Sequence, residues 1–281
     1  MKNLIKLMTL TILLSVILMS CGTEETTAES DKNTLRVGID LKFPPFMYED
    51  ENNNPTGLEP DIARAFGDYL GMNVEIVNTD FSMLIPALQT GEVDVGISDI
   101  SVTPEREKSV DFSIPYRYGR TPVLVNKDFY DNNNVTDEMT ASEFFNIDGA
   151  KFIGLSGTVG TIIPSRYGVE ADEATEIGTA IMEVATGQSD AIVGSYVVFG
   201  DHHANPVTTE IYLGIEDSTP SAFAFKKGNT QMVERANEFI ETLYQDGGLY
   251  ERLAEKYDDE INKVFYSDEL GLDYIVSKPA K

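Results

Sequence analysis

Apolar residues along the chain alternate between short runs and helical repeats. Their spacing predicts β-strands at 35–39, 73–77 and 93–97, with helices between them at 58–70 and 82–88. Leu58, Ile62 and Phe66 recur every four residues in the first helix, and Gly71 is placed to end it. Ser82 is a candidate N-cap for the second helix. Strands and helices in this order predict a mostly parallel α/β sheet.

A second series of elements begins near residue 151. The pattern predicts strands at 152–155 and 191–193, and helices at 159–167 and 179–186. Gly168 and Gly187 follow the two helices as stop signals. The polar stretch at 128–134, between the two series, is predicted to be a loop. Two α/β series in one chain predict two lobes.

Residues 90–99 and 186–195 resemble each other. Each segment begins with Thr-Gly, reaches an Asp three residues after the Gly, and then enters a short apolar strand that leads into a small or polar loop. Ligands of open α/β sheets bind beyond the carboxyl ends of strands. If the lobes face each other, Asp99 and Ser195 therefore lie on opposite walls of one cleft. The alternative is a chance match, because Thr-Gly-x-x-Asp is a common junction between helix and strand.

The N-terminus has the pattern of an export signal. Lys2 and Lys6 precede an apolar run at 7–19, which is short for a membrane-spanning helix. The run ends Leu-Met-Ser-Cys, which resembles a bacterial lipobox and implies cleavage before Cys21 and lipidation of its sulfur. We therefore expect a signal peptide at 1–21, a flexible tether at 22–33, and an extracytoplasmic protein that is lipid-anchored to the cell membrane. An ordinary signal peptide or a buried helix with a chance Cys are the alternatives.

Charge and composition exclude several classes of function. The 281 residues carry 47 acidic and 21 basic side chains, a net charge of −26, which argues against a nucleic-acid partner. The single cysteine excludes an intrachain disulfide and a multi-cysteine metal site. The two histidines, His202 and His203, are adjacent and would point apart, so we expect a surface loop, and neither a metal nor a cofactor.

Several stretches resemble one family, the bacterial extracellular solute-binding proteins of family 3, which feed polar amino acids to ABC transporters. The matching stretches are 35–40 (LRVGID), 43–46 (FPPF), 57–63 (GLEPDIA), 84–91 (LIPALQTG), 101–106 (SVTPER), 110–116 (VDFSIPY) and 246–257 (DGGLYERLAEKY). The resemblance implies a two-lobed α/β fold like that of periplasmic binding proteins, with a ligand cleft and a two-strand hinge between the lobes. It also implies a small-molecule ligand, a membrane permease as partner, and a monomer. We expect lobe 1 at 34–123 and 220–266, lobe 2 at 124–219, and a C-terminal tail at 267–281.

Arg106 is the strongest candidate for a ligand contact. Thr103 is a good N-cap and Pro104 suits the first position of a helix, which places Arg106 in the first turn. The resemblance implies that the Arg106 guanidinium clamps the α-carboxylate of the ligand. Pairing with Glu105 or Glu107 on a solvated face is the alternative.

The resemblance assigns further roles by position. Phe43 would stack on the ligand and Phe81 would form a second aromatic wall, although both could be ordinary core residues. Asp40 would meet the distal polar group of the ligand. The remaining expected ligand contacts are Ser98 and Ser101 in lobe 1, and Thr158 and Gly160 near the start of a helix in lobe 2.

One position departs from the family pattern. Relatives commonly place an Asp in the second lobe for the ligand ammonium, where this chain has Ser195, and this chain instead has Asp99 in the first lobe. Asp99 could bind the ammonium from the opposite wall, the ligand could be something other than an ordinary α-amino acid, or Asp99 could cap a local turn.

An enzyme of the same fold is the alternative from another class. Residues 112–116 and 119–122 also resemble cyclohexadienyl dehydratase, in which a Glu lies just past the second-lobe strand. Such an enzyme needs a general acid in its cleft, and residues 195–198 contain none. We therefore expect a binding protein that performs no chemistry on its ligand.

Overall fold

The computed structural model describes residues 33–156, 158–215, 218–265 and 270–275. The predicted signal peptide, Cys21 and all of the predicted tether except Asn33 lie outside the described residues, as do 267–269 and 276–281 of the predicted tail. In the part of the chain that the structure describes, no helix is both long enough and apolar enough to cross a bilayer.

The first lobe is built on a five-stranded sheet with the order β5-β1-β6-β15-β7. Its strands are β1 (Thr34–Ile39), β5 (Asn73–Asn78), β6 (Val95–Gly96), β7 (Val110–Phe112) and β15 (Ala224–Lys226). β1 and β6 are parallel and pair Val37 with Val95. β15 is antiparallel to both β6 and β7.

The second lobe is built on another five-stranded sheet, with the order β11-β10-β12-β9-β13. Its strands are β9 (Val123–Asn126), β10 (Phe152–Leu155), β11 (Asp172–Ala174), β12 (Ala191–Val193) and β13 (Thr209–Tyr212). β10 is parallel to β11 and β12, whereas β9 is antiparallel to β12 and β13. The predicted α/β fold with two lobes is confirmed, but both sheets are mixed rather than mostly parallel.

Helices cover both sheets. They are α2 (Leu58–Leu70), α3 (Leu84–Thr90), α4 (Lys127–Asn132), α5 (Ala141–Phe145), α6 (Val159–Arg166), α7 (Ile177–Thr186), α8 (Val198–Ala204), α9 (Thr230–Leu243), α10 (Leu249–Phe265) and α11 (Leu272–Ile275). Two 3₁₀ helices are η2 (Phe81–Met83) and η3 (Arg106–Lys108). A small antiparallel sheet consists of β2 (Lys42–Phe43), β3 (Met47–Glu49) and β4 (Pro55–Thr56).

Two inner strands of the second sheet, β9 and β12, are buried on both faces. Val123 and Val125 of β9 pack into one apolar cluster, and Leu124 between them packs into another on the opposite face. In β12, Ile192 likewise packs on the face opposite to its two neighbours. Because both faces of β9 and β12 are covered by apolar clusters, these two strands are nearly continuous apolar runs in the sequence.

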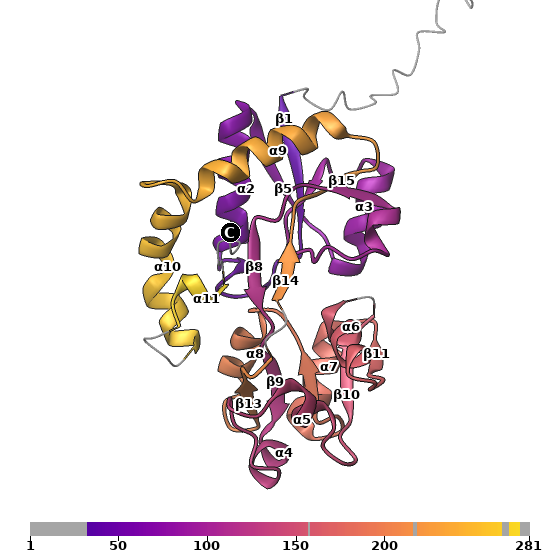
Figure 1. Ribbon diagram of the computed structural model, residues 1–281. Coiled ribbons are helices and arrows are strands. Elements are labelled where there is room, and N and C mark those ends of the chain that lie inside the picture. The colour runs from indigo at the N-terminus through magenta and orange to yellow at the C-terminus, as the bar shows by residue number, and fades with distance from the viewer. Residues whose placement is uncertain (1–32, 157, 216–217, 266–269, 276–281) are drawn as a thin grey trace, which may run out of the picture. The chain divides into compact units, whose positions relative to one another are not determined.

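A two-stranded ribbon connects the sheets. β8 (Arg117–Arg120) and β14 (Ser218–Ser221) pair antiparallel and run side by side (Figure 1). β8 leads into β9 of the second sheet, and β14 leads back into β15 of the first. The strands that follow the ribbon enter each sheet against the direction of its parallel strands, which is why both sheets are mixed.

The resemblance between 90–99 and 186–195 extends to their local structure. Gly91 and Gly187 both end a helix in the left-handed region, with φ of 81° and 73°. Three residues later, the carboxylate of Asp94 accepts the backbone N–H of Arg36, and that of Asp190 accepts the backbone N–H of Lys151. Each Asp thus joins the start of its strand to the neighbouring parallel strand, so the two segments are structural equivalents.

Three local predictions were wrong. Residues 128–134 form most of helix α4 rather than a loop, because Asn126 caps it by accepting the N–H of Phe129, whose ring packs on the second-lobe core. His202 and His203 lie in α8 rather than in a loop, and His202 Nδ1 is 3.1 Å from Thr209 Oγ1. Ser82 lies within η2 and does not cap α3.

Asp201, in the first turn of α8, is half-buried. Among the described residues, its Oδ2 is buried and has no hydrogen-bond partner. Burial raises the pKa of Asp201 to about 7, because the charged form loses its hydration. The carboxyl therefore takes up a proton on folding at mildly acidic pH.

The predicted consequence is a pH-dependent gain of stability in Asp201→Asn. The unfolded carboxyl titrates near about 3.9, so the wild type loses stability as the pH rises from that value through about 7. We expect the melting temperature of the variant minus that of the wild type to grow between these pH values and to level off above them. Thermal melts across this range measure it, with Asp128→Asn, an exposed aspartate in the first turn of α4, as the matched control. A difference that stays flat with pH would contradict the assignment.

Candidate functional site

A cavity is lined by residues from both lobes. The first lobe contributes Asp40, Lys42, Phe43, Met47, Asp80, Phe81, Ser82, Ser98, Asp99 and Ser101. The second lobe contributes Leu155, Thr158, Val159, Thr175, Glu176, Ile177, Ile192, Val193, Gly194, Ser195, Val197 and Val198.

Most of the residues expected to contact a ligand line this cavity. They are Asp40, Phe43, Phe81, Ser98, Asp99, Ser101, Thr158 and Ser195. Asp99 and Ser195, which end the two equivalent segments, thus line the same cavity from different lobes. Gly160 is not among the lining residues, because it packs on the second sheet, where an added Cβ would lie 2.9 Å from the Cα of Gly154.

Arg106 lines an adjoining hollow that shares Phe81 and Glu176 with the cavity. Its Nη1 donates to the carbonyl of Ser101 at 2.9 Å, and its Cζ lies 5.0 Å from the centroid of the Phe81 ring. The residue is 9% exposed, and burial lowers the pKa of Arg106 to about 10, so the guanidinium is still charged at neutral pH.

The charge of Arg106 is not neutralised locally. Glu105 pairs with Lys108 instead, and among the described residues no carboxylate forms an ion pair with Arg106. Thr103 accepts the N–H of Arg106 at 3.2 Å through its hydroxyl, but the N-cap of the turn that contains Arg106 is Glu105 and not Thr103. The predicted helix is wrong in extent, because Arg106 begins a three-residue 3₁₀ turn.

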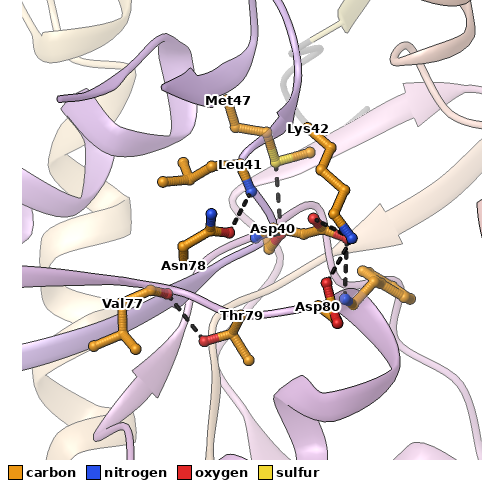
Figure 2. Close-up of polar contacts among 10 residues, drawn as sticks. Asp40, Leu41, Lys42, Met47, Val77, Asn78, Thr79 and Asp80 are labelled. Atoms are coloured by element: carbon orange, nitrogen blue, oxygen red, sulfur yellow. Dashed lines mark hydrogen bonds and ion pairs between the residues drawn. The ribbon is translucent and has the colours of Figure 1, made fainter. Parts of the chain in front are cut away.

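Asp40 lines the cavity, and its carboxylate lies close to the ammonium of Lys42 (Figure 2). The residue is 2% exposed, and its Oδ2 accepts the N–H of Phe81 at 3.0 Å. Its Oδ1 has no hydrogen-bond partner among the described residues, and the Nζ of Lys42 lies 3.7 Å away. Lys42 donates instead to Asp80. Burial raises the pKa of Asp40, as expected for a carboxylate whose lost hydration is only partly replaced.

Asp99 is held by partners from the connecting ribbon. Its carboxylate forms a buried ion pair with Arg117, the first residue of β8, and its Oδ1 accepts the hydroxyl of Ser221, the last residue of β14, at 2.6 Å. Asp99 adopts a left-handed backbone conformation with φ of 51°, which Asp tolerates better than most residues. A ligand ammonium at Asp99 would therefore be a second cation on a carboxylate that is already paired.

Sequence reasoning missed three charged residues of the cavity, which are Lys42, Asp80 and Glu176. Asp80 and Glu176 each follow the carboxyl end of a strand, β5 and β11 respectively. The rule that ligands bind beyond the carboxyl ends of strands could have identified them. With these residues, the described lining carries four carboxylates and one ammonium, an excess of negative charge.

The other predicted contacts have local roles as well. Thr158 caps α6 by accepting the N–H of Gly160, and its hydroxyl donates to the carbonyl of Leu155. Ser98 accepts the N–H of Asp40 at 3.1 Å and so helps to orient that residue. Among the described residues, no group of three or more His, Cys, Asp or Glu side chains is arranged to hold a metal ion.

The chain is similar to known proteins over most of its length. The profile of the bacterial extracellular solute-binding proteins, family 3, matches residues 35–260. The arginine-binding extracellular protein ArtP of Bacillus subtilis (strain 168) is 26% identical over 243 residues, which are 85% of this chain and 92% of ArtP. The L-cystine-binding protein TcyJ of Escherichia coli (strain K12) is 26% identical over 234 residues, which are 81% of this chain and 83% of TcyJ.

Solved structures give the same match. An ancestral arginine-binding protein bound to arginine is 31% identical, with a TM-score of 0.65 and coverage of 80% of this chain and 98% of that one. An ancestral amino acid-binding protein described as a precursor of cyclohexadienyl dehydratase is also 31% identical, with a TM-score of 0.65 and coverage of 80% and 95%.

Proposed function

Since the chain belongs to the bacterial extracellular solute-binding proteins of family 3, we propose that it captures a small polar amino acid for an ABC importer. The ligand binds in the cavity lined by both lobes, and the loaded protein delivers it to a membrane permease. In this proposal lobe 1 comprises 34–123 and 220–266, lobe 2 comprises 124–219, and 267–281 form a C-terminal tail. The protein works as a monomer.

The buried guanidinium of Arg106 is the observation that carries the proposal. A buried cation without a carboxylate partner is costly, and a ligand carboxylate would compensate it. The Ser101 carbonyl orients the guanidinium, which also lies over the Phe81 ring. Arg106 can therefore bind the α-carboxylate of an amino acid whose remaining atoms extend into the cavity.

The charge of the cavity favours a ligand with a cationic side chain. Of the four carboxylates in the lining, Asp99 is paired with Arg117, which leaves three beside the one ammonium of Lys42. The Oδ1 of Asp40 has no hydrogen bond in the described structure. A guanidinium or ammonium at Asp40 would supply that bond and offset the excess negative charge. The names of several relatives, which bind arginine, support the same substrate class.

Ligand binding would stabilise one arrangement of the two lobes through contacts with both walls of the cavity. A ligand that contacts Arg106 or Asp40 in one lobe and the 194–198 segment in the other favours the arrangement in which both contacts exist. The β8–β14 ribbon is the covalent connection about which the lobes would turn. No bond of the ligand needs to be broken in this process.

Replacing Arg106 with Ala is expected to remove amino-acid binding. We expect a loss of roughly 2–5 kcal/mol of binding free energy, because a buried charge-assisted contact is lost. A thermal-shift screen of amino acids first identifies the ligand, and calorimetry then compares the variants. Lys108→Ala is the matched control, since Lys108 lies in the same 3₁₀ turn with its side chain 70% exposed. Unchanged affinity in Arg106→Ala would contradict the proposal.

Replacing Asp40 with Asn tests the cationic side chain. The change keeps the shape and removes the charge, so affinity for L-arginine should fall about tenfold or more, while affinity for L-glutamine should change little. Calorimetric titration of both amino acids into wild type and variant gives the ratio. An equal loss for both ligands would show that Asp40 shapes the cavity and does not recognise a cation.

Lipid attachment at Cys21 is proposed from the sequence, which places a Cys directly after an apolar signal segment. We expect mass spectrometry of the mature N-terminal peptide to find an acylated Cys21 at the N-terminus. The Cys21→Ser variant should be released from the membrane fraction. An unmodified Cys21 in membrane-associated protein would contradict this anchor.

A dehydratase activity is the second candidate, because one structural neighbour is described as a precursor of cyclohexadienyl dehydratase. That neighbour is itself described as an amino acid-binding protein, and residues 195–198 of this chain contain no acid. Product analysis after incubation with the ligands found in the thermal screen separates a binder from an enzyme.

A further inference from the structure

A buried carboxylate joins the two lobes outside the cavity. Glu59, in the first turn of α2, is fully buried. Its Oε1 accepts the hydroxyls of Tyr116 and Tyr196, each at 2.7 Å. Tyr116 immediately precedes the ribbon strand β8, whereas Tyr196 follows β12 of the second sheet, so one oxygen of the first lobe binds a side chain from each lobe.

Tyr196 is enclosed by residues of the first lobe and the ribbon. It is 1% exposed and belongs to the apolar core of the first lobe. The ring of Phe46 packs edge-on against it at 4.5 Å, and the guanidinium of Arg117 lies 4.4 Å from its centroid. Helix α8, which follows Tyr196, is also close to the first lobe, since a Cβ on Gly200 would be 2.6 Å from the carbonyl oxygen of Pro44.

The same segment forms a wall of the cavity. Gly194, Ser195, Val197 and Val198 all line it, while Tyr196 between them is buried in the first-lobe core. Arg117, against the Tyr196 ring, also holds the cavity residue Asp99. The second-lobe wall is therefore fixed to the first lobe through Tyr196, and Phe199 in the helix that follows packs on Phe265 of the first lobe, with 4.1 Å between the ring centroids.

We propose that the hydrogen bond from Tyr196 to Glu59 is a non-covalent tether between the lobes, which holds the 194–198 wall of the cavity in position. Breaking it would leave a buried carboxylate with one hydroxyl fewer, a costly state in a site that excludes water. When the lobes move relative to each other, they then turn about this hydrogen bond and about the ribbon. Tyr196 is a positioning residue, since it acts on the ligand through Ser195 and its neighbours.

Tyr116 provides an unusually close control. Both tyrosines donate to the same oxygen at the same distance, and both are 1% exposed. They differ in that Tyr116 belongs to the first lobe, so its bond to Glu59 does not join the lobes. Tyr116→Phe and Tyr196→Phe therefore remove equivalent bonds, and only the second removes the tether.

Hydrogen–deuterium exchange of the purified, ligand-free chain tests the tether. In Tyr196→Phe we expect backbone amides in 194–204 to exchange about tenfold faster, as for the loss of one hydrogen bond to a buried charge. In Tyr116→Phe the same amides should stay within about twofold of wild type, although both variants lose similar thermal stability. Equal acceleration in both variants, or none in Tyr196→Phe, would overturn the proposal.

A binding measurement extends the test and rests on the proposed function. With L-arginine as the probe, Tyr196→Phe should bind about fivefold more weakly than wild type, and Tyr116→Phe within about twofold. Equal losses in the two variants would assign the effect to Glu59 and not to a tether between lobes. If the wild type binds no amino acid, the proposed function fails, while the exchange experiment still decides the tether.

Discussion

The rest of the structure depends on the buried ion pair between Asp99 and Arg117, which joins the first sheet to the ribbon between the lobes. Asp99 lies beyond the first sheet, Arg117 begins the ribbon, and Ser221 on the other ribbon strand donates to the same carboxylate. A buried charge without a partner is costly, and removing one member of a buried pair leaves the other uncompensated. The cavity wall and the connection between the lobes are therefore fixed by one set of charges, which extends through the Tyr196 ring to Glu59.

This pairing determines which charges remain for a ligand. The charge of Asp99 is neutralised within the protein, whereas Arg106 forms no ion pair and Asp40 keeps an oxygen without a hydrogen bond among the described residues. A zwitterion with a cationic side chain complements this arrangement, because its carboxylate suits Arg106 and its distal cation suits Asp40. Arg106 thus has no carboxylate partner among the described residues, Asp40 is only partly compensated by Lys42 at 3.7 Å, and Asp99 is paired with Arg117 of the ribbon.

Much of this architecture could be predicted because it is encoded locally. Short apolar runs identified β1, β5, β10 and β12, the four-residue repeat identified α2, and glycines marked helix ends. The repeated Thr-Gly-x-x-Asp pattern placed Asp99 and Ser195 on one cavity. Local patterns failed for α4. Its Phe129 packs on the second-lobe core, but the residues around it in the sequence are polar and give no sign of this packing.

Contacts between distant residues could not be predicted from pattern. Tyr196 and Glu59 are 137 residues apart, and nothing near either one indicates the other. The ion pair between Asp99 and Arg117 could not be predicted for the same reason, because nothing in the sequence distinguishes Arg117 from the other charged residues. Lys42, the first residue of β2, and Asp80, which follows β5, meet only through the folding of the chain.

The central claim is that one amino acid spans the cavity between Arg106 and Asp40. A crystal structure of the protein with the amino acid that gives the largest thermal shift tests it most directly. The account predicts the ligand carboxylate within hydrogen-bonding distance of the Arg106 guanidinium and the distal group of the ligand at Asp40 Oδ1. A ligand whose carboxylate is held by other groups, or one bound outside the cavity, would contradict it.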